Sequence, residues 1–200
     1  MKQAATTIDL LRHGQTEGGE IFRGSTDLPL TDEGWQQMQR ALQGQADWQC
    51  IISSPLSRCA DFARWLAAHQ GIPHDSQPGL QEICFGDWEG RPFAEIQTQY
   101  GEQLKQFWRD PVRHTPPNAE PMTAFCQRVK TCLWQRVAEH RSEHLLLVTH
   151  GGVIRAILAD ILGSDISSLM RYDVPYASLS RIRIYHDDGS DWPQLVFFNR

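Results

Sequence analysis

Two histidines follow two apolar runs of the chain, and each histidine is followed at once by glycine. Residues 8–11 lead through Arg12 to His13, and residues 145–148 lead through Thr149 to His150. If both runs are strands of an open α/β sheet, both imidazoles lie in the crevice at the carboxyl ends of the strands, where such folds bind ligands. Gly14 and Gly151 would let backbone N–H groups approach an anion closely. Two imidazoles facing one ligand are therefore the first chemical hypothesis.

Two arginines are predicted to reach the same crevice. Arg12 directly precedes His13, and Arg58 follows a third apolar run, residues 50–53. Two guanidiniums and two imidazoles repel one another unless an anion lies between them. Arginine binds phosphate oxygens bidentately, so a phosphate dianion is the natural occupant. A single histidine or arginine would be more typical of a structural or solvated residue, and the joint placement at three strand ends favours the phosphate site.

Apolar periodicity predicts strands that alternate with helices. Strands are expected over 6–11, 50–53 and 145–149, and helices after Thr31 as N-cap and over 59–66, 122–137 and 153–162. Residues 93–108 indicate one or two short helices, and 111–121, with four prolines, an irregular segment. Residues 178–185 and 193–198 indicate an antiparallel hairpin around the turn 187–190. These patterns predict an α/β fold in three layers, with a mainly parallel twisted sheet, helices on both faces and a small helical cap insertion.

Composition limits the classes of protein. The 200 residues contain no clear linker, which predicts one domain over 1–200 with a cap-like insertion at about 86–120. A net charge of −5 argues against a nucleic-acid partner, and no apolar run approaches the roughly 20 residues that span a membrane. The five cysteines form no CxxC pair, which argues against a disulfide framework or a zinc ribbon. Without a secretory apolar segment at the N-terminus, a cytoplasmic location is expected, and the oligomeric state stays open.

Beyond single residues, the chain resembles the histidine phosphatase superfamily, to which phosphoglycerate mutases also belong. The resemblance rests on motifs in the same order along nearly the whole chain: LRHGQT at 11–16, FRG at 22–24 with DLPLT at 27–31, SSPLSR at 53–58, LQE at 80–82, FGDWEG at 85–90 and THGG at 149–152. The first motif alone is short and weakly specific. The ordered series is a strong indication of the family.

The resemblance implies a mechanism. His13 would be the nucleophile, whose neutral ring nitrogen takes the phosphoryl group before water releases phosphate from the labile N–P bond. Arg12, Arg58 and His150 would hold the phosphoryl oxygens, with His150 most effective when protonated, and backbone N–H groups near Gly151 would assist. No metal ion or other cofactor is required.

Glu82 matches the acidic residue of the family, which would protonate the leaving oxygen and later activate water. Glu17, Asp87 and Glu89 lie close by in the sequence, and a surface position is favoured for all three. Gly19 stands where these phosphatases often have an asparagine that helps to hold phosphate, so that contact is lost or passes to another residue. The candidates are Thr16, Ser25 and Arg23, and the expected substrate-binding set is Arg12, Arg58, His150, Gly151, Thr16 and Arg23.

The substrate remains open between several small phosphate esters. The chain is shorter at its C-terminus than the mutases, and residues 85–90 look more like the phosphatase branch. Residues 11–19 and 58–63 resemble α-ribazole phosphatases, which implies α-ribazole 5′-phosphate, an ester of cobalamin biosynthesis. The alternatives are a broad-specificity phosphatase of sugar phosphates or phosphoglycerates, or a mutase. A module that binds phosphate or phosphoproteins without turnover would need the arginines but neither His13 nor Glu82, so the enzyme is favoured.

Two further patterns are open to a functional interpretation. Tyr100, Phe107 and Trp108 could stack on a planar base, although packing of the cap onto the body is favoured. His140 and His144 have helical i, i+4 spacing but lack an evident third ligand, so no metal site is predicted.

Overall fold

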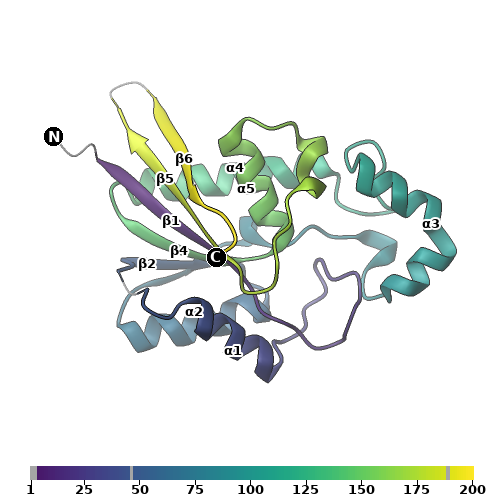
Figure 1. Cartoon of the computed structure of the whole chain (residues 1–200), viewed down its shortest axis with the longest axis horizontal. Helices are drawn as coiled ribbons and strands as arrows, with labels where there is room; N and C mark the ends of the chain where they lie inside the picture. Colours follow the sequence, from purple (N-terminus) through teal and green to yellow (C-terminus); the bar gives the residue numbers. More distant parts are fainter. Residues whose placement is uncertain (1–3, 46, 188–189) are drawn as a thin grey trace.

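A single sheet organises the computed structural model, which describes residues 4–45, 47–187 and 190–200 (Figure 1). Within these ranges, six strands lie in the order β3-β2-β4-β1-β5-β6. The parallel strands are β1 (Ala5–Arg12), β2 (Cys50–Ser53), β3 (His74–Ser76) and β4 (His144–Thr149). The antiparallel strands are β5 (Leu179–His186), which pairs with β1, and β6 (Asp191–Phe197), which pairs with β5. The predicted mainly parallel sheet with a C-terminal hairpin is confirmed, and the hairpin turn includes positions 188–189, outside the described residues.

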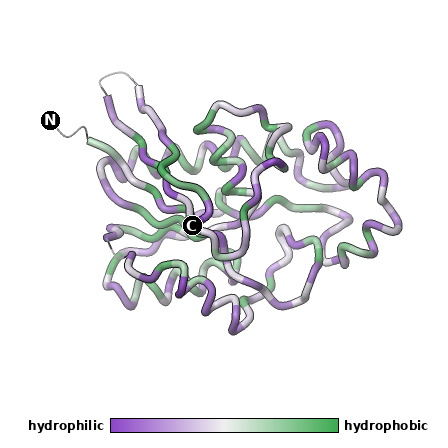
Figure 2. Tube along the Cα trace, in the orientation of Figure 1, coloured by the Kyte–Doolittle hydropathy of each residue, from purple (hydrophilic) through white to green (hydrophobic). Residues whose placement is uncertain are grey.

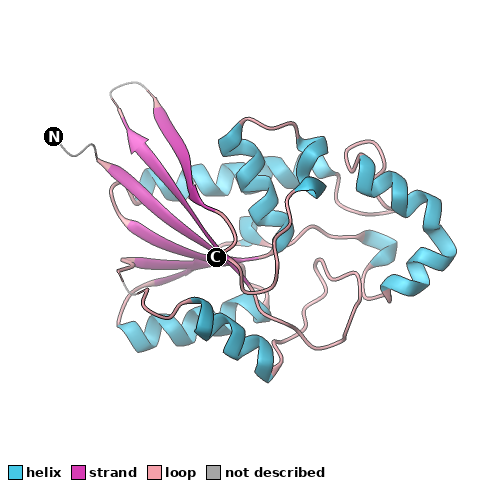
Figure 3. Ribbon diagram, viewed as in Figure 1, coloured by secondary structure: helices cyan, strands magenta, loops and turns pink. Residues whose placement is uncertain are grey.

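Helices cover both faces of this sheet, as predicted (Figure 3). α1 (Asp32–Ala41) and α2 (Ser57–Gln70) lie on one face, and α4 (Met122–Glu139) and α5 (Gly151–Leu162) lie on the other. α3 (Phe93–Arg109) lies beyond the sheet, at the end of the molecule away from the N-terminus. Short 3-10 turns at Pro78–Leu80, Gly86–Trp88 and Ile166–Arg171 were not predicted. Among the described residues, no helix is both long and apolar enough to cross a bilayer.

Side chains of the central strands alternate between two apolar cores. Leu10 and Leu147 belong to the core that includes α4 and α5, whereas Leu11 and Val148 belong to the core that includes α1 and α2. All four side chains are fully buried. Parallel strands that are covered on both faces therefore appear as continuous apolar runs, and Figure 2 shows these strands largely in green.

Helix ends follow the sequence signals closely. Thr31 caps α1, because its hydroxyl oxygen accepts a hydrogen bond from the Gly34 N–H at 2.9 Å. The loop after β1 passes directly over this end of α1, since a Cβ atom on Gly14 would lie only 2.0 Å from the Gly34 carbonyl oxygen. α5 begins at Gly151, two residues before the predicted start, so its N-terminus directly follows His150.

The segment that precedes α4 packs onto the body through aromatic residues. α3 is one helical run with a kink at Tyr100, where φ is −128° and ψ is 27°. Phe107 is fully buried, and its ring centroid lies 5.9 Å from that of Trp88. Tyr100 is half-buried against the same indole, at 6.3 Å. The packing interpretation therefore holds for these two rings, whereas Trp108 is 41% exposed. Residues 111–121 are irregular, as predicted.

Candidate active site

The two histidines meet at the carboxyl ends of neighbouring strands. β1 and β4 are adjacent and parallel, and Arg12 lies opposite Thr149 in the register, so His13 and His150 leave the sheet side by side. Their ring centroids are 5.2 Å apart. Both are buried, with exposed fractions of 5% for His13 and 0% for His150. The sheet topology thus produces the juxtaposition that the duplicated sequence pattern predicts.

His13 is held in the tautomer that a nucleophile needs. Its Nδ1 lies 2.8 Å from the Gly14 carbonyl oxygen. Because a carbonyl only accepts hydrogen bonds, Nδ1 carries the proton, and the neutral ring keeps its lone pair on Nε2. Burial, followed by the charges of Arg58 and Arg12, holds the pKa of His13 well below its usual value. A neutral imidazole with a free Nε2 is therefore the dominant form near pH 7.

His150 is held in the opposite tautomer. Its Nδ1 accepts a hydrogen bond from Nε of Arg58 at 3.2 Å, so the Nε2 proton is donated to the Ser54 hydroxyl at 2.7 Å. Burial, then Arg58 and His13, lowers the pKa of His150 well below its usual value. The expected imidazolium is thus disfavoured, because an arginine already donates to Nδ1. A phosphate dianion would supply the opposing charge that protonation of His150 requires.

The two arginines are fixed by different loops. Arg58 is fully buried and donates to the carbonyl oxygens of Thr26 at 2.8 Å and Gly24 at 2.7 Å. Arg12 donates to the Val174 carbonyl, and its guanidinium lies 4.1 Å from the centroid of the Tyr176 ring. Burial lowers the pKa of both guanidiniums, but an arginine remains charged near pH 7. The Arg12 Nε is buried and has no hydrogen-bond partner among the described residues.

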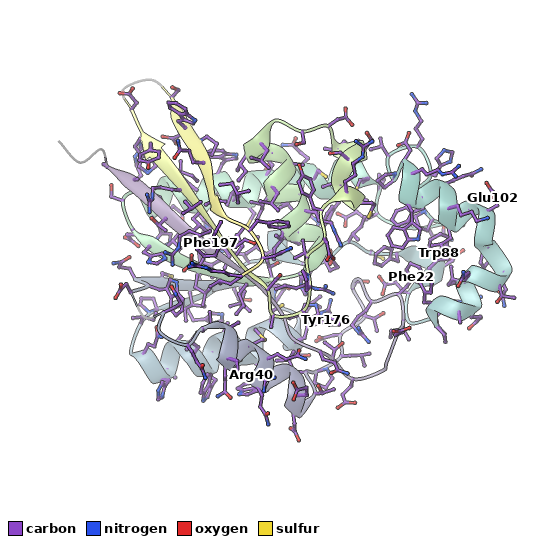
Figure 4. The ribbon with its side chains drawn as sticks, in the orientation of Figure 1. Phe22, Arg40, Trp88, Glu102, Tyr176 and Phe197 are labelled. Carbon is purple, nitrogen blue, oxygen red and sulfur yellow. The ribbon has the colours of Figure 1, made fainter. Side chains whose placement is uncertain are left out.

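A cavity of about 280 Å³ opens over this cluster. Its polar lining comes from Arg12, His13, Arg23, Glu82, Gly151, Arg155 and Tyr176. The apolar lining includes Phe22, whose ring centroid lies 5.2 Å from that of Trp88. Figure 4 shows these two side chains beside α3. Five predicted site residues thus share one cavity, namely Arg12, His13, Arg23, Glu82 and Gly151. Arg58 and His150 have no exposed surface and contribute to the cluster from within the protein.

The candidates for the missing asparagine contact differ from one another in their placement. Thr16 is buried, does not line the cavity, and pairs through its backbone with Leu30. Arg23 lines the cavity and donates from one terminal nitrogen to the carbonyl oxygens of Glu17 and Gly19, both at 2.8 Å. Arg23 therefore braces the loop at the position where the family often has asparagine. Ser25 is exposed, does not line the cavity and donates its N–H to Glu89. Arg23 is therefore the strongest of the three candidates for the missing contact.

Glu82 is held at the N-terminus of α5. Its Oε2 accepts a hydrogen bond from the Gly152 N–H at 2.9 Å, and Oε1 accepts one from the Ile83 N–H at 3.0 Å. A Cβ atom on residue 152 would lie 2.2 Å from Oε1, so this approach requires glycine. The carboxyl group is thus held in a fixed position in the lining of the cavity that it shares with His13.

The alternative acids have other partners. Glu89 accepts hydrogen bonds from the backbone N–H groups of residues 24–26 and 85, and from the Thr26 hydroxyl. Burial acts to raise the pKa of Glu89, but these hydrogen bonds outweigh burial and lower it. Asp87 binds the Asn118 side chain, and Glu17 is exposed. Glu89 is therefore a clamp for the 24–26 loop, and Glu82 is the acid that reaches the cavity.

Sequence reasoning missed two polar residues of the cavity lining. Arg155 lies one helical turn after Gly151, and its Nε donates to the Tyr172 carbonyl at 2.8 Å. As the one charged residue in the apolar stretch 152–159 beside a predicted anion site, it carried a usable signal. Tyr176 lies in the loop before β5, and its ring centroid is 5.7 Å from that of His13. Nothing in the local sequence marked it.

The paired histidines of the α4–β4 region have separate partners. Nδ1 of His140 lies 2.9 Å from the Glu143 carboxylate, and Nε2 of His144 lies 3.0 Å from Asp9. Within the described ranges, no group of three or more potential metal-ligating side chains comes together.

Comparison with known proteins adds a family and a range of activities. The model of the histidine phosphatase superfamily (branch 1) matches residues 8–193. The adenosylcobalamin/α-ribazole phosphatase of Salmonella typhimurium is 30% identical over 179 residues, which cover 88% of this chain and 89% of the relative. The glucosyl-3-phosphoglycerate phosphatase of Mycolicibacterium vanbaalenii is 32% identical over 171 residues, which cover 80% of this chain and 75% of the relative. The solved structure of a mycobacterial glucosyl-3-phosphoglycerate phosphatase has a TM-score of 0.85 and 26% identity, and covers 98% of this chain and 99% of that one.

Proposed function

This chain belongs to the histidine phosphatase superfamily, and from that premise we propose that it hydrolyses phosphate monoesters through a phosphohistidine on Nε2 of His13. The observation that carries the proposal is the His13 hydrogen bond to the Gly14 carbonyl, which leaves Nε2 as the free nucleophilic nitrogen. The low pKa of His13 supports it, because only the neutral ring attacks phosphorus. The two relatives described above are phosphatases.

In the first step, the Nε2 lone pair attacks phosphorus in line with the ester oxygen. The P–O bond to the alcohol breaks, and protonated Glu82 gives its proton to the departing oxygen. Arg12 and the N–H of Gly151 are the donors that line the cavity, and Arg58 adds positive potential from within the protein. His150 is neutral in the free protein and adds positive charge only when a bound phosphate dianion brings a proton to its ring. The products of this step are the free alcohol, phosphorylated His13 and the Glu82 carboxylate.

In the second step, water replaces the alcohol. The Glu82 carboxylate accepts a proton from the water as its oxygen attacks phosphorus, and the N–P bond breaks with its electron pair returning to Nε2. Inorganic phosphate leaves, and both side chains regain their starting protonation states. The two steps need no metal ion, because guanidiniums neutralise the phosphoryl charge.

We propose α-ribazole 5′-phosphate as the substrate, with a cytoplasmic location. Two observations support this substrate. The chain is similar to the α-ribazole phosphatases, and the cavity has an aromatic lining that suits a planar base, formed by Phe22, Phe85, Phe93 and Trp108. A carboxylated ester such as glucosyl-3-phosphoglycerate is the second candidate. Arg23 and Arg155 favour it, because they add two cations to the cavity beyond Arg12.

A substrate panel tests the proposal. The kcat/KM values for α-ribazole 5′-phosphate, glucosyl-3-phosphoglycerate, 3-phosphoglycerate and fructose bisphosphates are compared in the presence of EDTA, with His13→Ala as the control. We expect hydrolysis that is lost in His13→Ala and that favours α-ribazole 5′-phosphate. Hydrolysis by the His13→Ala variant would overturn the mechanism, and preference for a carboxylated ester would replace the substrate. A chain that binds these esters without hydrolysing any of them would be a binding module.

A further inference from the structure

A second, smaller chamber of about 70 Å³ adjoins the catalytic cavity. Its apolar walls are Phe85, Trp108, Met122, Phe125, Leu169 and Met170. Glu82, Arg155, Phe85 and Trp108 line both spaces, whereas Arg12 and His13 line only the larger one. These four shared residues form the boundary between the two spaces, and the nucleophile lines only the larger one.

The position of Glu82 decides which part of a substrate lies near this chamber. In the proposed mechanism, the phosphoryl group lies against His13 and Arg12, and the ester oxygen lies next to Glu82. The alcohol that carries this oxygen must then continue from the boundary that Glu82 occupies. The chamber lies at that boundary, so the alcohol, and not the transferred phosphoryl group, is its nearest occupant.

The lining favours an apolar, planar group. Pockets for small molecules combine apolar walls with a few placed polar groups, and here the polar groups are Glu82 and Arg155 at the boundary. An apolar cavity of about 150 Å³ holds a benzene ring, so this chamber has room for one edge of a ring. The 41% exposed Trp108 lines both spaces and offers an indole against which the rest of the ring would lie.

Arg155 is suited to bind the alcohol at the boundary. Its Nε is fixed on the Tyr172 carbonyl, and it forms no ion pair with the residues that the structure describes. Burial lowers the pKa of Arg155, and it still carries its charge near pH 7. Its terminal N–H groups are therefore available to an oxygen of the alcohol beside the ester linkage.

We infer that this chamber is a subsite for the leaving group, which accepts the edge of an apolar ring while Arg155 binds an oxygen of the same alcohol. The substrates it selects are phosphate monoesters whose alcohol carries such a ring. The inference rests on the proposed function, because the role of Glu82 as the acid places the alcohol here.

Matched esters and a matched pair of variants test the chamber. Phenylethyl phosphate and ethyl phosphate have similar alkoxide leaving groups and differ by one ring, and α-ribazole 5′-phosphate and ribose 5-phosphate differ by the base. The ratio of kcat/KM values within each pair isolates the contribution of the ring. Met170→Phe fills the chamber and Met170→Ala enlarges it. Met170 is partly buried and lines the smaller chamber but not the cavity that holds His13.

We expect the ring to raise kcat/KM at least about tenfold in the unmodified protein, in the range that one apolar group contributes to specificity. Met170→Phe should lower that ratio at least about fivefold, and Met170→Ala should leave it the same or higher. A ratio near one in the unmodified protein, or a ratio that Met170→Phe does not change, would overturn the inference. The unmodified ratio keeps the test decisive even if Met170→Phe does not fold.

The two possible failures are distinguishable. If the subsite is wrong but the proposed function is right, both members of each pair are hydrolysed at similar rates and His13 is phosphorylated by both. If the proposed function is wrong, neither member is hydrolysed and no phosphohistidine forms on His13.

Discussion

Gly152→Ala is expected to impair catalysis by moving one carboxyl group. The N–H of residue 152 holds Oε2 of Glu82 at 2.9 Å, and the missing side chain leaves the space that this carboxylate occupies. A Cβ atom would lie 2.2 Å from Oε1, 3.0 Å from Cδ and 3.2 Å from Oε2. The substitution therefore acts on the acid and its anchor, and not on the nucleophile.

The size of the effect follows from the overlap. To reach the 3.4 Å at which ordinary van der Waals contact begins, Oε1 has to retreat by roughly 1 Å. A displacement of about 1 Å in a catalytic group costs on the order of 10²-fold in rate. We expect kcat/KM for an alkyl phosphate to fall by about that factor. For p-nitrophenyl phosphate we expect a loss below about tenfold, because nitrophenolate leaves without needing a proton.

The assay compares these two substrates in Gly152→Ala and in a matched glycine variant. Gly101→Ala lies on α3 with no atom within 4 Å of the new Cβ, so it controls for the substitution itself and should keep full activity. Inhibition by inorganic phosphate should change less than about threefold in both variants. Equal losses with both substrates, or no loss with the alkyl ester, would refute the placement of Glu82 as the acid.

Five further outcomes are expected. Glu82→Gln should slow alkyl phosphate hydrolysis by about 10²- to 10⁴-fold, the range for general acid catalysis, with inorganic phosphate inhibition largely kept. Near-normal turnover in that variant would remove Glu82 from the role. Burial and two arginines lower the pKa of His13, so in the profile of kcat/KM against pH the loss of activity on the acidic side should begin only below pH 6.5. Below pH 6.5, His13 takes up a proton in the unfolded chain but not in the folded chain. The free energy of unfolding should therefore fall as the pH drops from 6.5, and it should fall less steeply in His13→Asn. Arg155→Met should raise KM for ribose 5-phosphate, and it should weaken inhibition by inorganic phosphate less than Arg12→Met does. If Arg155→Met weakened this inhibition more than Arg12→Met, Arg155 would bind the phosphoryl group and not the alcohol. Asp9 is fully buried and accepts hydrogen bonds from Arg181, His144 and Trp48. Asp9→Asn should therefore lower the free energy of unfolding, measured with urea, by about 3 kcal/mol. A decrease below about 1 kcal/mol would show that this network adds little to stability.

The fold could be predicted where local signals and burial agree. The apolar run before Thr149 reads as a strand because β4 is buried on both faces, and Thr31 marks the start of α1 through its own hydroxyl. The kink at Tyr100 and the short strand β3 could not be predicted, because both depend on packing against distant segments. The sequence predicts the start of α5 two residues too late, because Gly151 and Gly152 are poor helix formers and do not look like the first turn of a helix.

The site divides in the same way. His13 and His150 could be found because parallel neighbouring strands deliver equivalent positions to one edge, and a repeated His-Gly pattern is visible in the sequence. The neutral state of His150 could not be predicted, because it depends first on the complete burial of the ring and then on Arg58, which donates to Nδ1 across 92 residues of sequence. Tyr176 was missed for a similar reason: its contact with Arg12 joins a loop without periodicity to the end of β1.

The central claim is a phosphoryl group bound covalently to His13. Rapid mixing with excess p-nitrophenyl phosphate, whose leaving group needs no proton from Glu82, followed by quenching at alkaline pH to preserve the N–P bond and peptide mass spectrometry, would test it most directly. Gly152→Ala serves as a variant that slows hydrolysis of the adduct. We predict a mass increase of one phosphoryl group on the peptide that contains His13, lost on brief acid treatment. Turnover without that adduct, or an adduct on a different side chain, would contradict the account.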